Sequence, residues 1–218
     1  MIKMLPPEEL ILLSKCLGNR EDINFFYSIV KGKTYNFLLD CGCGDGSADL
    51  ILAKKGFKII AMDVDQNLIS YAKKNNSYNN IEYLVADFKT FLPQKKFDII
   101  SFFWNSIAGL KYNEKGEVIN HLKNYVNTEG LLFIDSELHP FANYSFSLDG
   151  KITIKTFING KSLILVNSKG ITYEIKYWFH TKEDWENLFK KNNFYDFKFE
   201  EYLINNNKRV AIYGKYKN

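Results

Sequence analysis

The sequence predicts an α/β fold in which a mostly parallel sheet carries helices on both faces. Strand-like and helix-like segments alternate from residue 36 to residue 136, which is typical of a doubly wound parallel sheet. The strand-like segments are nearly continuous apolar runs, as expected for strands that are buried on both faces. A glycine-rich turn follows the first of these strands and opens a helix, at the place where such sheets bind their ligands.

The predicted elements follow in a regular order. Two helices are expected first, from about Pro7 to Cys16 and from Asp22 to Val30. Five strands then alternate with helices. We expect the strands at 36–40, 57–63, 81–87, 97–104 and 131–135, and the intervening helices at 47–55, 66–74 and 114–126.

After residue 136 the pattern changes. Three strand-like pieces, at 151–157, 162–166 and 171–178, are separated by Asn159-Gly160 and Lys169-Gly170, which are typical of hairpin turns. Thr181 and Asp184 resemble a capping box that begins another helix, and two final strands are expected at 197–203 and 209–216. We expect a single domain over 1–218, with N-terminal helices at 1–33, a core at 34–136, a small antiparallel β insert at 150–180, and a C-terminal helix and strand pair at 181–218.

Composition excludes several classes of protein. Hydrophobic residues make up 46% of the 218 residues, far from a disordered composition, and the net charge is only +4. The lysines are spread along the chain, so no nucleic-acid tail is expected. We find no secretory signal pattern and no apolar run near the ~18 residues that a membrane span needs. The three cysteines, an odd number without a metal-ligand pattern, predict reduced thiols, no metal site and a cytoplasmic location.

The turn after the first strand carries the strongest functional signal. Its glycines at 42, 44 and 46 allow sharp turns and a close approach to a ligand. The dinucleotide pattern G-x-G-x-x-G fails at Ser47, and no lysine follows as in a phosphate-binding loop. Asp40 and Asp45 would repel a diphosphate by ~1–4 kcal/mol for each close charge pair. A positively charged ligand fits the turn better.

Two further acidic strand ends face the same crevice in the predicted fold. Asp63 ends the second strand, near the place where an acidic residue binds ribose hydroxyls in nucleoside sites of this architecture. Asp87 ends the third strand and could accept a hydrogen bond from an adenine amino group, while Phe88 offers the base an apolar face. Asp63 and Asp87 also fit helix N-caps, and for Asp65 this interpretation is at least as good as ligand contact.

These segments together resemble the class I, Rossmann-like methyltransferases that use S-adenosylmethionine. The segment 40–46 is similar to their motif I, 61–65 to their acidic second motif, 85–88 to their adenine-contacting segment, and 97–100 to the strand before their acceptor site. Thr128-Glu129-Gly130 departs from the usual proline-glycine-glycine, which puts the start of the fifth strand in doubt. The resemblance covers about residues 20–136.

The resemblance implies a seven-stranded sheet with an antiparallel last strand, S-adenosylmethionine as cofactor and S-adenosylhomocysteine as product. The insert resembles the lid of small-molecule methyltransferases. The residues expected to bind the cofactor are Asp40, Gly42, Cys43, Gly44, Gly46, Asp63, Val64, Asp87, Phe88, Phe103 and Tyr27.

Methyl transfer is an in-line displacement in which alignment of the reactants supplies much of the catalysis. His139 is a candidate base and Asn105 a candidate for positioning the acceptor. We expect a methyltransferase acting on nitrogen or oxygen of a small-molecule acceptor, as a monomer or homodimer. An RNA or protein methyltransferase and a non-catalytic module that binds the cofactor are the alternatives.

Overall fold

A seven-stranded mixed sheet forms the centre of the molecule. The computed structural model describes residues 6–15, 20–136, 138, 145–148, 152–158, 162–168, 171–204 and 207–217. The strand order is β10-β11-β5-β4-β1-β2-β3. The strands are β1 (Phe37–Cys41), β2 (Lys58–Asp63), β3 (Ile81–Val85), β4 (Phe97–Phe102), β5 (Val126–Ser136), β10 (Phe194–Ile204) and β11 (Asn207–Tyr216).

The predicted fold class is confirmed. β1 to β5 pair in parallel, whereas β11 is antiparallel to both of its neighbours, β5 and β10. The last strand of the chain is therefore the antiparallel one. The carboxyl ends of β1, β2 and β4 meet at one edge of the sheet, which brings the turns after these strands together.

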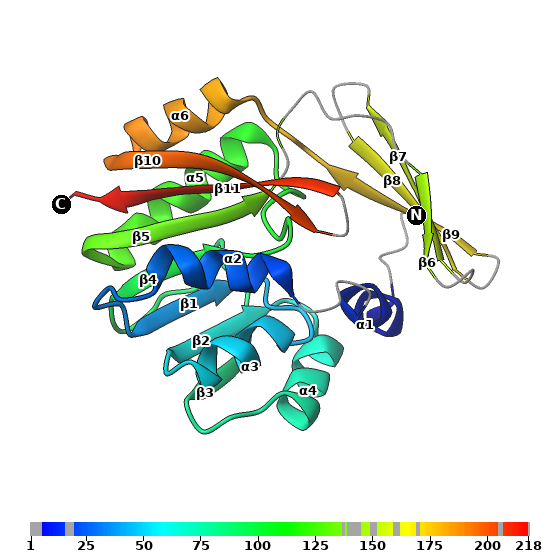
Figure 1. The fold of residues 1–218 in the computed structure, drawn as a ribbon, viewed down its shortest axis with the longest axis horizontal. Coiled ribbons are helices and arrows are strands. Elements are labelled where there is room, and N and C mark those ends of the chain that lie inside the picture. Colours follow the sequence, from blue (N-terminus) through cyan, green and yellow to red (C-terminus); the bar gives the residue numbers. More distant parts are fainter. Residues whose placement is uncertain are drawn as a thin grey trace.

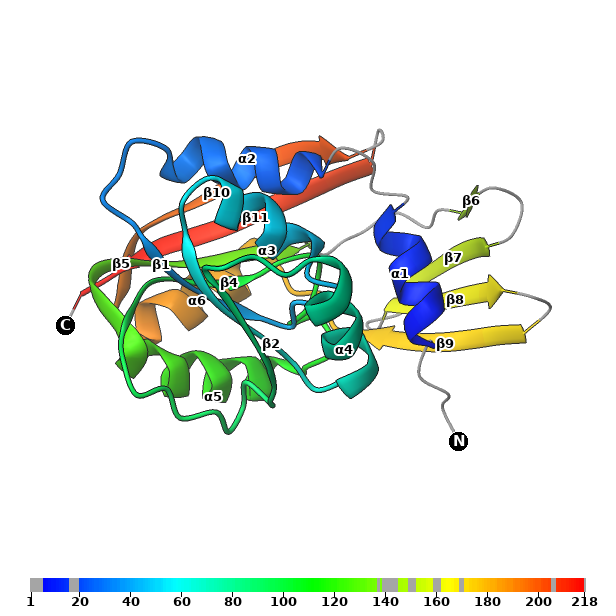
Figure 2. The same ribbon diagram turned by 90° about the horizontal axis from the view of Figure 1, so that it is seen from below.

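Helices cover both faces of this sheet (Figures 1 and 2). One face packs against α2 and α3 through buried residues that include Phe26 and Leu52, and the other packs against α5 and α6 through Ile119 and Trp185. The helices are α1 (Pro7–Lys15), α2 (Glu21–Val30), α3 (Ser47–Lys54), α4 (Gln66–Asn75), α5 (Tyr112–Leu122) and α6 (Lys182–Lys191), and a 3₁₀ turn, η1, spans Lys123–Tyr125.

A second, four-stranded antiparallel sheet follows β5, as expected. It consists of β6 (Ser145–Leu148), β7 (Ile152–Ile158), β8 (Ser162–Ser168) and β9 (Ile171–Tyr177), paired in chain order. The sequence predicted three of these strands and missed β6. The two ribbon views place this sheet, with α1 beside it, beyond the carboxyl ends of the parallel strands (Figures 1 and 2).

The exit from this insert is fastened to the main domain. The backbone N–H of Trp178 donates to the carbonyl of Ala108 at 2.7 Å, and the buried Lys115 on α5 donates through Nζ to the carbonyl of Trp178. The turn after β4 is thereby tied to the end of the insert.

The start of the fifth strand differs from the prediction. β5 begins at Val126, which pairs with Phe97, and the register shifts before Leu131 pairs with Ile99. Glu129 adopts a φ of 64° within this shift. Left-handed backbone at this position forms a bulge, where the sequence pattern had indicated a turn. The predicted capping box is confirmed, since Thr181 Oγ1 accepts from the Asp184 N–H at 3.1 Å.

In the described part of the chain, no helix has the length and apolarity needed to cross a membrane.

Candidate functional site

The glycine turn between β1 and α3 is fixed to the neighbouring strand by its own backbone. The N–H groups of Gly42 and Cys43 donate to the carbonyl of Met62 at 2.8 and 2.9 Å. The three glycines have φ values of 83°, 59° and 76°, which residues with a Cβ rarely adopt. A Cβ on Gly42 would lie 2.6 Å from the Cβ of Ser106. The turn therefore needs glycine to approach the segment that follows β4.

Asp63 joins this turn to β2. Its Oδ2 accepts from the Gly44 N–H at 3.0 Å, and its Oδ1 accepts from the Asp65 N–H at 2.9 Å. Partial burial raises the pKa of Asp63 above its ordinary value. The neighbouring Val64 is 59% exposed, which offers an apolar surface beside this carboxylate. The structure thus brings Asp63, Val64 and the glycine turn together at the carboxyl edge.

The other acidic strand ends have clear local roles. Asp65 caps α4, because its Oδ1 accepts from the N–H groups of Asn67 and Leu68. Asp87 caps a turn through the Lys89 N–H at 2.9 Å and also pairs with the Lys89 amine at 3.5 Å. Phe88 packs edge-on against Phe102, at 5.4 Å between ring centroids. The structure therefore shows the capping role that was the alternative for Asp65. Asp87 caps a turn and also lies at the carboxyl edge of the sheet.

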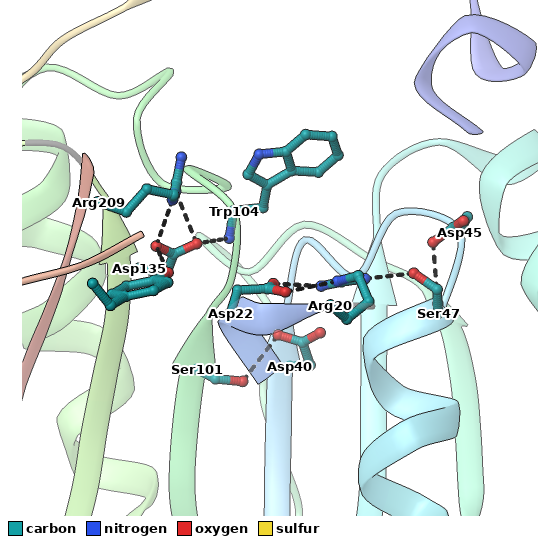
Figure 3. Close-up of polar contacts among 10 residues, drawn as sticks. Arg20, Asp22, Asp40, Asp45, Ser47, Ser101, Trp104, Asp135 and Arg209 are labelled. Carbon is teal, nitrogen blue, oxygen red and sulfur yellow. Dashed lines mark hydrogen bonds and ion pairs between the residues drawn. The ribbon is translucent and has the colours of Figure 1, made fainter. Parts of the chain in front are cut away.

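Asp40 is fully buried at the end of β1. Its Oδ1 accepts from the Ser101 hydroxyl on β4 at 2.9 Å (Figure 3). Burial raises the pKa of Asp40, against the lowering effects of Ser101 and of Arg20. Asp49, on the first turn of α3, is also fully buried, and burial with the Asp40 charge raises its pKa as well. Cys43 is buried and its thiol pKa is raised, so it is not a nucleophile at neutral pH.

Arg20 lies above this acidic group. Its guanidinium binds Asp22 through Nε–Oδ1 at 2.9 Å and Nη2–Oδ2 at 2.7 Å, and Nη1 donates to Ser47 Oγ (Figure 3). Burial alone would lower the pKa of Arg20, but Asp22, Asp45 and Asp40 together raise it. Arg20 therefore stays charged and ties α2 to the start of α3.

A second buried ion pair supports the turn after β4. Asp135 on β5 accepts from Arg209 on β11 at 2.9 and 2.8 Å, from the Tyr202 hydroxyl, and from the Trp104 N–H at 2.8 Å (Figure 3). Trp104 and Asn105 both have positive φ, 44° and 61°. Such backbone costs roughly 1–3 kcal/mol per residue and persists only where the surroundings enforce it. The Asp135 carboxylate and carbonyl, which bind both N–H groups, provide that enforcement.

Asn105 is brought to this edge as predicted, whereas Phe103 is buried in the core. Asn105 is 6% exposed, and its Oδ1 and Ser106 Oγ have no hydrogen-bond partner among the described residues. Phe103 packs in the core against Phe26 and Phe133, at 5.0 and 5.5 Å between ring centroids. The left-handed backbone after Phe103 leaves Trp104 only partly buried at the end of β4 (Figure 3). A contact between Phe103 and the cofactor stays a prediction.

Two other predicted residues lie elsewhere. The Tyr27 ring lies under the Lys55 amine, at 4.1 Å, by the C-terminal end of α3 and not at the glycine turn. The predicted contact between Tyr27 and the cofactor stays a prediction. His139, the candidate base, lies outside the described residues.

Several residues of the edge were missed by sequence reasoning. Arg209 contacts Asp135 across 74 positions, and no local pattern predicts such a pair. Asp49 had a usable signal, because it precedes Leu52 and Ala53 at helical spacing and so lies on their buried face.

Comparisons with known proteins agree with the geometry. A family model described as a methyltransferase domain matches residues 38–130. A malonyl-[acyl-carrier protein] O-methyltransferase of Ilyobacter polytropus is 31% identical over 102 residues, which cover 45% of this chain and 38% of that protein. The chain spans less than half of the length of the curated relatives that it matches, from 26% to 41%.

Solved structures share the whole fold. DesVI of Streptomyces venezuelae superposes with a TM-score of 0.77 at 14% identity, covering 99% of this chain and 100% of that one. The sugar N-methyltransferase KedS8 of Streptoalloteichus gives a TM-score of 0.74 at 15% identity, covering 100% and 94%. At these identities the likeness concerns the fold.

Proposed function

We propose that this chain transfers a methyl group from S-adenosylmethionine to nitrogen or oxygen of a small-molecule acceptor. Residues 38–130 match a family model described as a methyltransferase domain, and the sheet has the strand order of the class I enzymes. One observation carries the choice of cofactor. The glycine turn is surrounded by carboxylates, with Asp63 hydrogen-bonded to Gly44 and Asp40 buried below, and the nearby Arg20 is already paired with Asp22. Such surroundings favour a cation and disfavour a diphosphate.

The residues fit the parts of this cofactor. Asp63 presents carboxylate oxygens for the ribose hydroxyls while its backbone partners hold it in place. Val64 is exposed beside it, and Phe88 with Asp87 would hold the adenine. The acidic group around Asp40 would attract the ammonium of the methionine part. When bound, S-adenosylmethionine supplies an activated methyl group on its sulfonium.

The protein's own contribution is alignment. The turn formed by Trp104, Asn105 and Ser106 faces the glycine turn, and Gly42 allows the two to touch. Asn105 Oδ1 and Ser106 Oγ are free acceptors among the described residues, so they could orient an O–H or N–H of the acceptor molecule. A structural neighbour, KedS8, is described as a sugar N-methyltransferase, which supports a small-molecule acceptor.

A melting experiment tests the cofactor. At a hundredfold excess over its dissociation constant, a ligand stabilises the native state by ~2.7 kcal/mol, which corresponds to roughly 5–10 °C for a chain of this size. S-adenosylmethionine and S-adenosylhomocysteine should both produce this shift, and NAD should not. Asp63→Ala should remove most of it, whereas Glu82→Ala, an exposed acid on β3, should keep it.

A shift with NAD and with neither adenosyl ligand would refute the proposed cofactor. Formation of S-adenosylhomocysteine over a panel of small amines and alcohols then tests the reaction. Turnover with RNA or a protein, but with no small molecule, would replace the proposed acceptor class.

A further inference from the structure

Two carboxyl groups are buried between the end of β1 and the start of α3. Asp40 is at the end of β1 and Asp49 is on the first turn of α3, and both side chains are fully buried. The two carboxyls affect each other's pKa: hydrogen bonding with Asp49 lowers the pKa of Asp40, and the charge of Asp40 and hydrogen bonding with it raise the pKa of Asp49. Figure 3 shows Asp40 beneath the Arg20–Asp22 pair.

Three of their four oxygens lack an ordinary donor. Asp40 Oδ1 accepts from Ser101, but Asp40 Oδ2 and both oxygens of Asp49 receive no N–H or O–H from the described residues. A buried ionised carboxylate without partners is disfavoured by several kcal/mol. If one carboxyl is protonated, its O–H can donate to the other, which satisfies two of these oxygens at once.

The surroundings do not neutralise a second negative charge. Arg20 is the cation that acts on both groups, and its guanidinium is already bound to Asp22 and Ser47. Asp63 from β2 raises the pKa of Asp40, and Asp45 from the glycine turn raises that of Asp49. The nearby Tyr83 hydroxyl and Cys43 thiol have raised pKa values and stay neutral.

We propose that Asp40 and Asp49 share one proton in the free protein and release it when the ammonium of the cofactor binds over Asp40. The released proton passes to solvent, and the pair changes from one negative charge to two. Asp49 is then a positioning residue that acts through Asp40 and makes cofactor binding depend on pH. This inference rests on the proposed function, because it needs a cationic ligand at the glycine turn.

Calorimetric titration with S-adenosylhomocysteine tests this inference without knowledge of the acceptor. The apparent binding enthalpy is measured in phosphate and in imidazole buffer, between about pH 6 and pH 8, and its dependence on buffer ionisation enthalpy gives the protons released. At the acidic end we expect close to one proton released, with affinity rising up to about tenfold per pH unit. The release should fade toward the alkaline end, where the free pair has already lost its proton.

Asp49→Asn should abolish the release, because the amide of the substituted side chain supplies the donor that the shared proton supplied. Glu82→Gln is the control, since Glu82 is an exposed acid on β3 and lies outside the pair and the glycine turn. The control should release the proton as the wild type does.

Each outcome has a separate meaning. Tight binding with no proton released by the wild type, or equal release from Asp49→Asn, overturns the shared proton and leaves the proposed function intact. Absence of binding by both adenosyl ligands overturns the proposed function itself. If Asp49→Asn does not fold, the wild-type titration in the two buffers still decides.

Discussion

The buried pair of Asp135 and Arg209 provides the sharpest test of how the turn after β4 is stabilised. Asp135→Asn keeps the volume of the side chain but removes the carboxylate that binds Arg209, whose side chain is 5% exposed. Removing one partner of such a buried pair typically costs about 3–5 kcal/mol. For a chain of this size that corresponds to a fall in Tm of roughly 6–20 °C.

The matched control lies on the same two strands. Glu129 on β5 faces Lys215 on β11 at 3.6 Å, but there the side chains are 57% and 34% exposed. Exposed pairs contribute about 0–1 kcal/mol, so Glu129→Gln should change stability by less than about 1 kcal/mol. Both variants are measured by denaturant unfolding at a fixed pH, with Arg209→Met and the double variant completing a cycle.

The double-mutant cycle separates the interaction energy of the Asp135–Arg209 pair from the contributions of the two residues taken singly. We expect the double variant to be more stable than the sum of the single losses predicts, because the two buried charges are then removed together. A loss below about 1 kcal/mol in Asp135→Asn, or strict additivity in the cycle, would refute the role assigned to this pair. Tryptophan emission adds a local readout, since the backbone N–H of Trp104 donates to the same carboxylate.

The remaining predictions concern other parts of the fold. Burial lowers the pKa of Lys115 from 10.5 to about 7, so the folded protein loses stability as the pH falls from 10.5 to about 7. Lys115→Met should therefore raise Tm near neutral pH, and this gain should shrink as the pH is raised toward 10.5. Gly46→Ala should destabilise by about 2 kcal/mol or more in denaturant unfolding and weaken cofactor binding, because the new Cβ would contact Tyr83 Oη at a φ of 76°. Thr181→Ala should cost about 1 kcal/mol in denaturant unfolding through loss of the helix cap, while Thr181→Ser should not.

Much of the sheet could be predicted because its strands are short apolar runs bounded by turn residues. β1, β2 and β4 begin and end within two residues of the prediction, since burial on both faces leaves a continuous signal. The fifth strand was harder, because the bulge at Glu129 places exposed polar residues inside a paired strand. β6 was missed although Ser145 to Leu148 alternates between polar and apolar residues, because the strand is only four residues long.

The acidic half of the site could be predicted for the same reason that the strands could. Asp40 and Asp63 each end an apolar run, so their place at the edge follows from topology alone. The other half of the site, formed by the turn after β4 and the Asp135–Arg209 pair, could not be predicted, because it depends on backbone conformation and on long-range contacts. The sequence predicted a strand over 97–104, but the positive φ of Trp104 ends the alternation, so that Trp104 packs against the same core cluster as Phe103.

These two halves differ in charge, and the difference has a consequence for binding. On the β1 and β2 side, the guanidinium of Arg20 lies among several carboxyls, those of Asp22, Asp40, Asp45 and Asp49. On the β5 and β11 side, Arg209 balances Asp135. A ligand with a positive end is therefore drawn to the glycine turn, and its orientation is set before any acceptor contact forms. Because most of these carboxyls are buried, dissolved salt screens them weakly, and we expect cofactor affinity to change far less with ionic strength than binding to a nucleic acid would.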